Sequence, residues 1–177
     1  MQIRTDGLII VSQSIKTTGM KQLIATIASL ALVSCQSIWS DDPSSISFKI
    51  PRGSTLSLEK SIEIPEGRTL AVFQYGELIP SRKRDIYDLY CNFEVIKPGL
   101  RTISPEVFTV RRTDDWTEQL SRTTLCHFTV VHLESAKGTD INRLTCREIV
   151  RSSDYHFTAT QIEQTLGDYF TFAFATN

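Results

Sequence analysis

The sequence contains little histidine and little glycine, with three His and eight Gly in 177 residues. So few His residues leave little material for a metal cluster, and so few Gly residues leave little for a phosphate-binding loop. Nineteen Lys and Arg stand against 20 Asp and Glu, so the basic excess typical of nucleic-acid-binding proteins is missing. We therefore expect no cofactor, no metal and no nucleic-acid partner.

Catalytic motifs are missing as well. The sequence has no Gly-x-Ser-x-Gly elbow and no His-Glu-x-x-His helix. His127 and His132 are five residues apart on a predicted strand, so they face opposite sides and cannot chelate one ion. Cys126 and His127 are neighbours that point apart, which excludes them as a nucleophile pair. No residue is predicted to be catalytic.

No apolar run is long enough for a membrane-spanning helix. The run Leu23–Val33 has eleven uncharged residues, whereas about 20 are needed to cross the hydrocarbon core. It follows Met20 and the single positive charge of Lys21, and this arrangement is typical of a secretory signal. The alternative is a buried core helix, but the run is apolar all round and lacks the stripe of an amphipathic helix.

The signal ends at Leu32-Val33-Ser34-Cys35, which resembles the lipobox of bacterial lipoprotein precursors. The resemblance implies lipidation of Cys35, cleavage before it, and a mature chain anchored to the membrane by its N-terminal lipid. In enteric-type lipoprotein families, Asp directly after the lipidated Cys favours retention in the inner membrane. This chain has Gln36 at that position. The resemblance therefore implies an outer-membrane lipoprotein with its domain in the periplasm or at the cell surface.

The chain divides into four predicted pieces. Residues 1–19 read as an over-extended N-terminus, 20–34 as the lipoprotein signal peptide, 35–50 as a tether and 51–177 as a β-rich periplasmic domain. Loss of residues 1–34 removes three basic groups and one acidic group, which leaves a mildly acidic mature chain of net charge −3.

Short alternating segments predict that the folded part is mainly β. Apolar and polar residues alternate over 56–64, and a turn at Pro65-Glu66-Gly67 leads to a strand over 68–75, which predicts a hairpin. A basic loop over 80–84 follows. The remaining strands are expected at 89–95, 107–112, 125–134 and 142–150. Six strands with short turns favour an antiparallel barrel or sandwich.

A short C-terminal helix is expected to complete the fold. Thr160 and Glu163 match the spacing of a capping box. Ile162, Leu166 and Phe170 follow at helical spacing and predict an apolar face that packs on the sheet.

Three cysteines remain once Cys35 is assigned to the lipid. Cys91 and Cys146 both lie on the apolar side of their predicted strands, so we favour a disulfide between them. Cys126 is a candidate partner for either one, and all three pairings stay open. A Cys91–Cys146 bridge would stabilise by about 4 kcal/mol in the chain-entropy model.

Two basic clusters are candidate anion-binding residues. Arg82, Lys83 and Arg84 form one, and Arg111 and Arg112 form the other. If they meet at the sheet rim, they would suit an anionic envelope polymer. Nearby Asp residues favour the simpler interpretation of a salt-bridged surface. Asp114-Asp115-Trp116 opens a predicted loop, and we expect the indole to fold back onto the sheet rather than stand free.

The strand motifs Tyr90-Cys91 and Leu144-Thr145-Cys146, with the C-terminal helix, resemble those of small uncharacterised proteobacterial outer-membrane lipoproteins. That resemblance covers roughly residues 56–171 and implies location and fold. We expect a non-enzymatic envelope protein that binds a protein or ligand. The alternatives are an envelope hydrolase using scattered Asp and Glu, and an inhibitor of a cell-wall lytic enzyme. The Tyr-x-Cys and Ser-Gly loop patterns of membrane-bound lysozyme inhibitors have no obvious counterpart.

Overall fold

The computed structural model describes residues 40–176. Cys35, the predicted signal peptide 20–34 and residues 1–19 lie outside this range. None of the helices in the described range is long and apolar enough to cross a membrane.

The described chain is mainly β, with one α-helix near its C-terminal end. Its elements in chain order are β1 (Thr55–Leu58), β2 (Ile62–Ile64), β3 (Leu70–Gln74), β4 (Glu77–Ile79), the 3-10 turn η1 (Ser81–Lys83), β5 (Tyr90–Val95), β6 (Arg101–Ile103), β7 (Glu106–Gln119), β8 (Thr124–Ser135), β9 (Ile141–Arg151), α2 (Ala159–Leu166), η2 (Gly167–Tyr169) and β10 (Phe170–Ala173).

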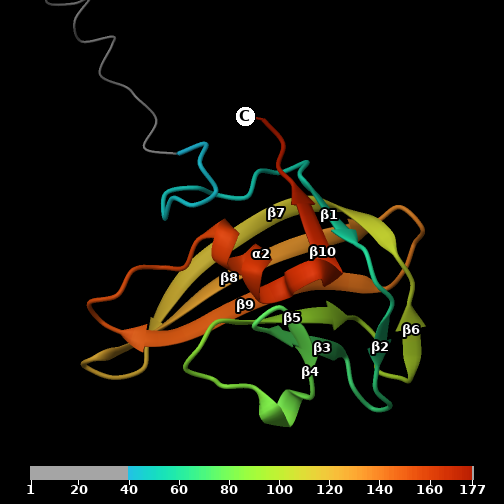
Figure 1. The fold of residues 1–177 in the computed structure, drawn as a ribbon, viewed down its shortest axis with the longest axis horizontal. Helices are drawn as coiled ribbons and strands as arrows, with labels where there is room; N and C mark the ends of the chain where they lie inside the picture. Colours follow the sequence, from blue (N-terminus) through green and yellow to red (C-terminus); the bar gives the residue numbers. More distant parts are fainter. Residues whose placement is uncertain (1–39, 177) are drawn as a thin grey trace, which may run out of the picture. The chain divides into compact units, whose positions relative to one another are not determined.

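Eight strands form one antiparallel sheet in the order β10-β1-β7-β8-β9-β5-β3-β4. The sheet curls around α2 as a half-barrel (Figure 1). β2 and β6 pair separately. We call the side that faces α2 the concave face and the other side the convex face.

The helix α2 lies between the two ends of the sheet and contacts β10 at one end and β3 and β4 at the other. The amide of Gly76, in the β3–β4 turn, donates to the Thr165 carbonyl at 3.1 Å. Gly167 ends the helix at φ 61°, and a Cβ there would lie 2.3 Å from the Gly76 carbonyl oxygen. This close approach requires glycine at position 167.

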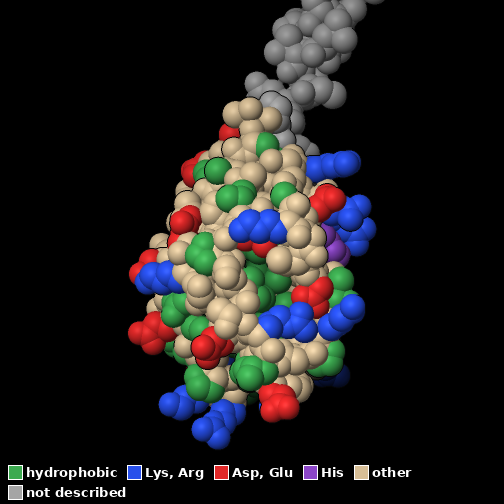
Figure 2. Space-filling view, turned by 90° about the vertical axis from the view of Figure 1, so that its right-hand side faces the viewer, with side chains coloured by type: hydrophobic (Ala, Val, Ile, Leu, Met, Phe, Trp, Pro, Cys, Tyr) green, Lys and Arg blue, Asp and Glu red, His purple; other side chains and the backbone are tan. Residues whose placement is uncertain are grey.

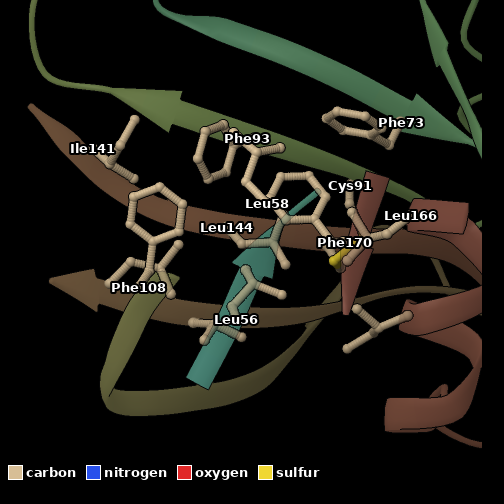
Figure 3. Close-up of a cluster of buried hydrophobic side chains, with 14 of the residues drawn as sticks. Leu56, Leu58, Phe73, Cys91, Phe93, Phe108, Ile141, Leu144, Leu166 and Phe170 are labelled. Carbon is tan, nitrogen blue, oxygen red and sulfur yellow. A yellow bond between two sulfur atoms is a disulfide. The ribbon is translucent and has the colours of Figure 1, made fainter. Parts of the chain in front are cut away.

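The concave face carries the hydrophobic core. Side chains from β1, β3, β5, β7 and β10 meet the helix there (Figure 3). Phe93 is fully buried and lies against Phe108 and Phe170, with ring centroids 5.6 and 5.1 Å apart. Strand alternation places Cys91, Phe93 and Val95 on this face, as the sequence predicts.

Cys91 and Cys146 form a disulfide, which confirms the favoured pairing. The two residues are directly opposite each other on β5 and β9, and both are fully buried on the concave face. Cys126 is free and buried. It follows the alternation of β8 onto the convex face, where neither of the other two cysteines points.

The strand count differs from the prediction. The expected strand over 56–64 divides into β1 and β2, because the chain bends at Lys60, just after the Glu59 amide donates to the Tyr169 carbonyl. β2 then pairs with β6. The expected hairpin around Pro65-Glu66-Gly67 does not form, since β3 pairs with β4 and β5. The short strands β4, β6 and β10 complete the count of eight plus two, which corrects the prediction of six.

The helix also differs in detail. Its N-cap is Thr158, and Gln161 completes the capping box, so α2 starts before the predicted Thr160. Phe170 was expected on the helix face but begins β10, since η2 ends the helical segment.

Part of the predicted tether packs against the domain. The Thr160 amide donates to the Pro43 carbonyl at 3.2 Å, Phe48 contacts Phe174 edge-on, and Ile50 is buried. Figure 2 views the protein from the side on which β2 and β6 lie. Hydrophobic side chains are visible there in a central hollow, with charged side chains around it.

Candidate functional site

Aromatic rings and guanidinium groups line up in one row across the convex face. Tyr90 on β5 is opposite Arg147 on β9, Arg147 is opposite Phe128 on β8, and Phe128 is opposite Trp116 on β7. Arg84, the residue after η1, reaches over the outer face of Tyr90. We call these five residues the ladder.

The contacts along the ladder are continuous. The guanidinium carbons of Arg84 and Arg147 lie 5.1 and 5.3 Å from the centre of the Tyr90 ring, and Arg147 lies 5.7 Å from that of Phe128. The rings of Phe128 and Trp116 stack at 4.8 Å, with only 7° between their planes. Cation–π contacts of this kind hold a guanidinium without a carboxylate partner.

The ladder ends on an accessible indole. Trp116 lies within β7 and not in the predicted loop. Its indole packs on the sheet through Phe128, as expected, yet 41% of its surface stays exposed. β1 pairs only with Glu106–Thr109, so Trp116 lies on a stretch of β7 that β8 alone flanks among residues 40–176. The outer face of the indole is therefore open for contact.

Three buried polar atoms on the convex face have unusually poor hydrogen bonding. Tyr90 Oη and Arg147 Nε in the ladder, and Asn92 Oδ1 on the same face of β5, make no well-formed hydrogen bond within the described residues. Burial raises the pKa of the Tyr90 phenol, while the charges of Arg147 and Arg84 act against that rise. Burial also raises the pKa of the Cys126 thiol, which keeps it protonated and unreactive at neutral pH.

The predicted anion-binding residues do not come together. Arg82 and Lys83 are exposed on η1, and only Arg84 joins the ladder. Arg111 lies 3.8 Å from Glu134 and Arg112 lies 3.1 Å from Asp114, so both have carboxylate partners on β7 and β8.

Arg147 is the functional candidate that sequence reasoning missed. It follows Cys146 on β9, and strand alternation predicts that it points away from the core. Its position between Tyr90 and Phe128 depends on the pairing of three strands, which alternation within one strand does not reveal.

A second polar cluster occupies the concave face near α2. The rings of His127 and His156 lie 4.8 Å apart, and Glu148 is opposite His127 on β9. Burial and the nearby His156 lower the pKa of His127. Burial raises the pKa of Glu148, and the charges of Asp88 and Asp154 add to the effect. His132 points to the convex face instead, where Asp114 Oδ2 lies 2.9 Å from its Nε2.

A cavity of about 190 Å³ lies between residues 46–50, the concave face and α2. Its polar groups largely satisfy one another: Lys49 Nζ is 3.1 Å from Asp115 Oδ2, and the Thr129 hydroxyl donates to Asp115 Oδ1 at 2.7 Å. His156 contacts the carbonyl oxygens of Phe157 and Phe128. This arrangement ties residues 46–50 to the sheet and resembles a structural network more than a reactive site.

No group of three or more His, Cys, Asp or Glu within the described range is placed to hold a metal ion. Comparisons of the chain with protein-family models, with curated proteins and with solved structures found no match. The ladder is thus the feature on which a functional proposal rests.

Proposed function

We propose that the protein is a lipid-anchored protein of the bacterial cell envelope whose β domain binds a partner without catalysis, through the ladder and its open end at Trp116. The lipobox at Cys35 supports the location. The observation that carries the binding role is the exposed indole at the end of a continuous stack.

Preorganisation supports this role. Phe128 fixes the indole from behind, and Arg147 and Tyr90 fix Phe128 in turn. A partner that covers Trp116 therefore causes little further loss of side-chain conformational entropy. Large amphipathic rings such as indole also contribute strongly to the binding energy of interfaces.

The anchor would hold the domain near the membrane through its N-terminal segment. Pro43 is the eighth residue after Cys35, and its carbonyl accepts a hydrogen bond from the Thr160 amide at the start of α2. An extended chain of that length spans at most about 28 Å. Pro43 would thus lie within that distance of the lipidated residue.

A hydrolase role has less support. Burial raises the pKa of Glu148 and of Glu163, as a general acid requires, but one residue is on β9 and the other on α2. Neither lines the cavity below residues 46–50, and Asp115, which does, is already paired with Lys49.

The location is tested by metabolic labelling with a radioactive fatty acid. The chain should incorporate label and fractionate with the outer membrane, and Cys35→Ala should abolish both. Label that persists in the variant would show that the lipobox is assigned wrongly.

The binding role is tested by photo-crosslinking in the producing bacterium. A benzophenone amino acid in place of Trp116 should give a discrete adduct. The matched control is the same amino acid in place of Glu63, exposed on β2. Equal yields at the two positions, or no adduct at position 116, would contradict a binding role for the ladder.

A further inference from the structure

The distal half of β7 is an open sheet edge. Among residues 40–176, β1 flanks only Glu106–Thr109, and Gly53 and Ser54 bond to the backbone of Val110. No strand in that range pairs with the outer side of Asp114–Gln119, although β8 pairs with its inner side throughout. Six residues at about 3.4 Å each give an edge of roughly 20 Å, the length of an ordinary strand.

The two outermost strands of the eight-stranded sheet, β10 and β4, are both in contact with α2. α2 contacts β10, β3 and β4, the Gly76 amide is bonded to Thr165, and Glu163 is hydrogen-bonded to the Phe172 backbone. Proteins usually protect an edge strand by such cover, by lysines or by keeping the strand short. No strand of residues 40–176 covers Asp114–Gln119, which has no Lys or Arg of its own. Lys49 contacts its start at Asp115, and its carboxylates are the charges that protect the rest of it.

Side chains on this edge define what fits beside it. Asp114, Trp116 and Glu118 alternate onto the convex face, in line with the ladder. An added strand would place residues of its own opposite these three, at i, i+2 and i+4, with Cβ atoms about 5 Å away. Opposite charges there favour pairing, and like charges oppose it.

Charge disfavours a second copy of the chain as the occupant. In a two-fold antiparallel pair centred on Trp116, Asp114 of each copy would face Glu118 of the other. Two pairs of carboxylates would then be opposed on one face, next to the indoles. A basic strand has the opposite effect, because its cations would face the same carboxylates. Asp114 is already in contact with Arg112 and His132, so Glu118 is the carboxylate that contributes most to this attraction.

We propose that an extended basic peptide segment of a partner protein docks on Asp114–Gln119 as an added antiparallel strand. Its Lys or Arg side chains lie opposite Asp114 and Glu118, and an Arg between them stacks on the outer face of Trp116. That Arg extends the ladder, in which Arg84 and Arg147 already lie against aromatic rings. The inference rests on the proposed binding function and specifies the partner's chemistry.

The test uses the full chain in detergent with Trp39→Phe, which leaves Trp116 as the only indole. The probe is the peptide Thr-Val-Lys-Thr-Arg-Thr-Lys-Val-Thr, which places Lys, Arg and Lys on one face. Titration should shift and saturate the Trp116 emission. The same peptide with Glu at its three basic positions should bind at least tenfold more weakly.

Backbone pairing is tested with two N-methylated forms of the peptide. Only alternate amides of an added strand face β7. Methylation of one alternate set should abolish binding, and methylation of the other should leave it within about twofold. If neither or both sets matter, the peptide does not bind as a strand.

Charge recognition is tested on the chain itself. Glu118→Lys should weaken binding of the basic peptide about tenfold, and Glu63→Lys, an equal charge change on β2, should leave it unchanged. No emission change with the basic peptide, or equal losses in the two variants, would overturn the inference. A position-116 adduct in cells together with no peptide binding would reject the added strand while leaving the proposed binding function intact.

Discussion

The two faces of the curled sheet are formed by the same strands but are covered by different kinds of interaction. On the concave face, buried aliphatic and aromatic side chains, a disulfide and α2 exclude water. On the convex face, guanidinium groups and rings stack in a single layer, and three buried polar atoms make no well-formed hydrogen bond within the described residues. We infer that the concave face supplies most of the stability and that the convex face, free of that task, is available for recognition.

The alternation of β5 shows how closely the two environments adjoin. Cys91 and Phe93 point into the core, while Tyr90, between arginines, points the other way. All three are fully buried. Burial alone therefore does not identify the core, and the chemistry of the covering side chains separates the two faces.

The largest expected effect is a contrast between two phenylalanines. Phe93→Ala should lower the free energy of unfolding by about 3–5 kcal/mol, because it opens a cavity in a closed core. Phe128→Ala removes the same side chain from the partly exposed convex face, and we expect about 1–2 kcal/mol there. Guanidinium denaturation of both variants measures the difference, and equal losses would contradict the division between the faces.

Loss of the disulfide should follow in size. Replacing Cys91 and Cys146 together by Ala should destabilise by about 2–5 kcal/mol, since the bridge restrains the unfolded chain. Cys126→Ala is the matched change on the convex face, and a buried single substitution of this kind should change stability by about 1 kcal/mol. Thermal unfolding by circular dichroism compares the two.

Within-strand features were predictable, and features that depend on strand pairing were not. Alternation placed Cys91 and Cys146 on one face and so indicated the correct disulfide. The ladder needs the register of β7, β8, β9 and β5, which alternation does not carry. The open edge of β7 likewise depends on β1 being short.

Competing local signals account for the errors near the C-terminus. Thr158 with Gln161 and Thr160 with Glu163 both match a capping box, and only the fold decides between them. Phe170 and Phe172 alternate as in a strand, but Phe170 also falls at helical spacing from Ile162 and Leu166. Pairing with β1 favours the strand.

The next prediction compares two glycines, of which only Gly167 lies at the contact between α2 and the β3–β4 turn. Gly167→Ala should destabilise by about 2–4 kcal/mol, because the new methyl group overlaps Gly76 and φ is positive. Gly138 also has a positive φ, but a Cβ there meets nothing within 4 Å, so Gly138→Ala should cost about 1 kcal/mol. If urea denaturation finds equal losses, contact between α2 and the β3–β4 turn does not close the fold.

The smallest expected effect concerns the ladder itself. Arg147→Met keeps the aliphatic stem but removes two cation–π contacts, so unfolding should become easier by about 1 kcal/mol at pH 7. The same change should raise the pKa of Tyr90 further, since the Arg147 charge now holds it down against burial. NMR of the chain labelled with 13C at the tyrosine Cζ follows that phenol separately, and Arg143→Met, which leaves the ladder intact, is the control.

The sign of the pH dependence follows from the raised pKa of Tyr90. A phenol whose pKa is higher in the folded state stabilises the fold fully below the unfolded value near 10, and this contribution is lost as pH rises toward the folded value. In Arg147→Met the folded value is higher still, so the loss should extend to higher pH than in the unmodified chain. An unchanged Tyr90 titration in Arg147→Met would show that the guanidinium does not act on the phenol and that the ladder is not electrostatically continuous.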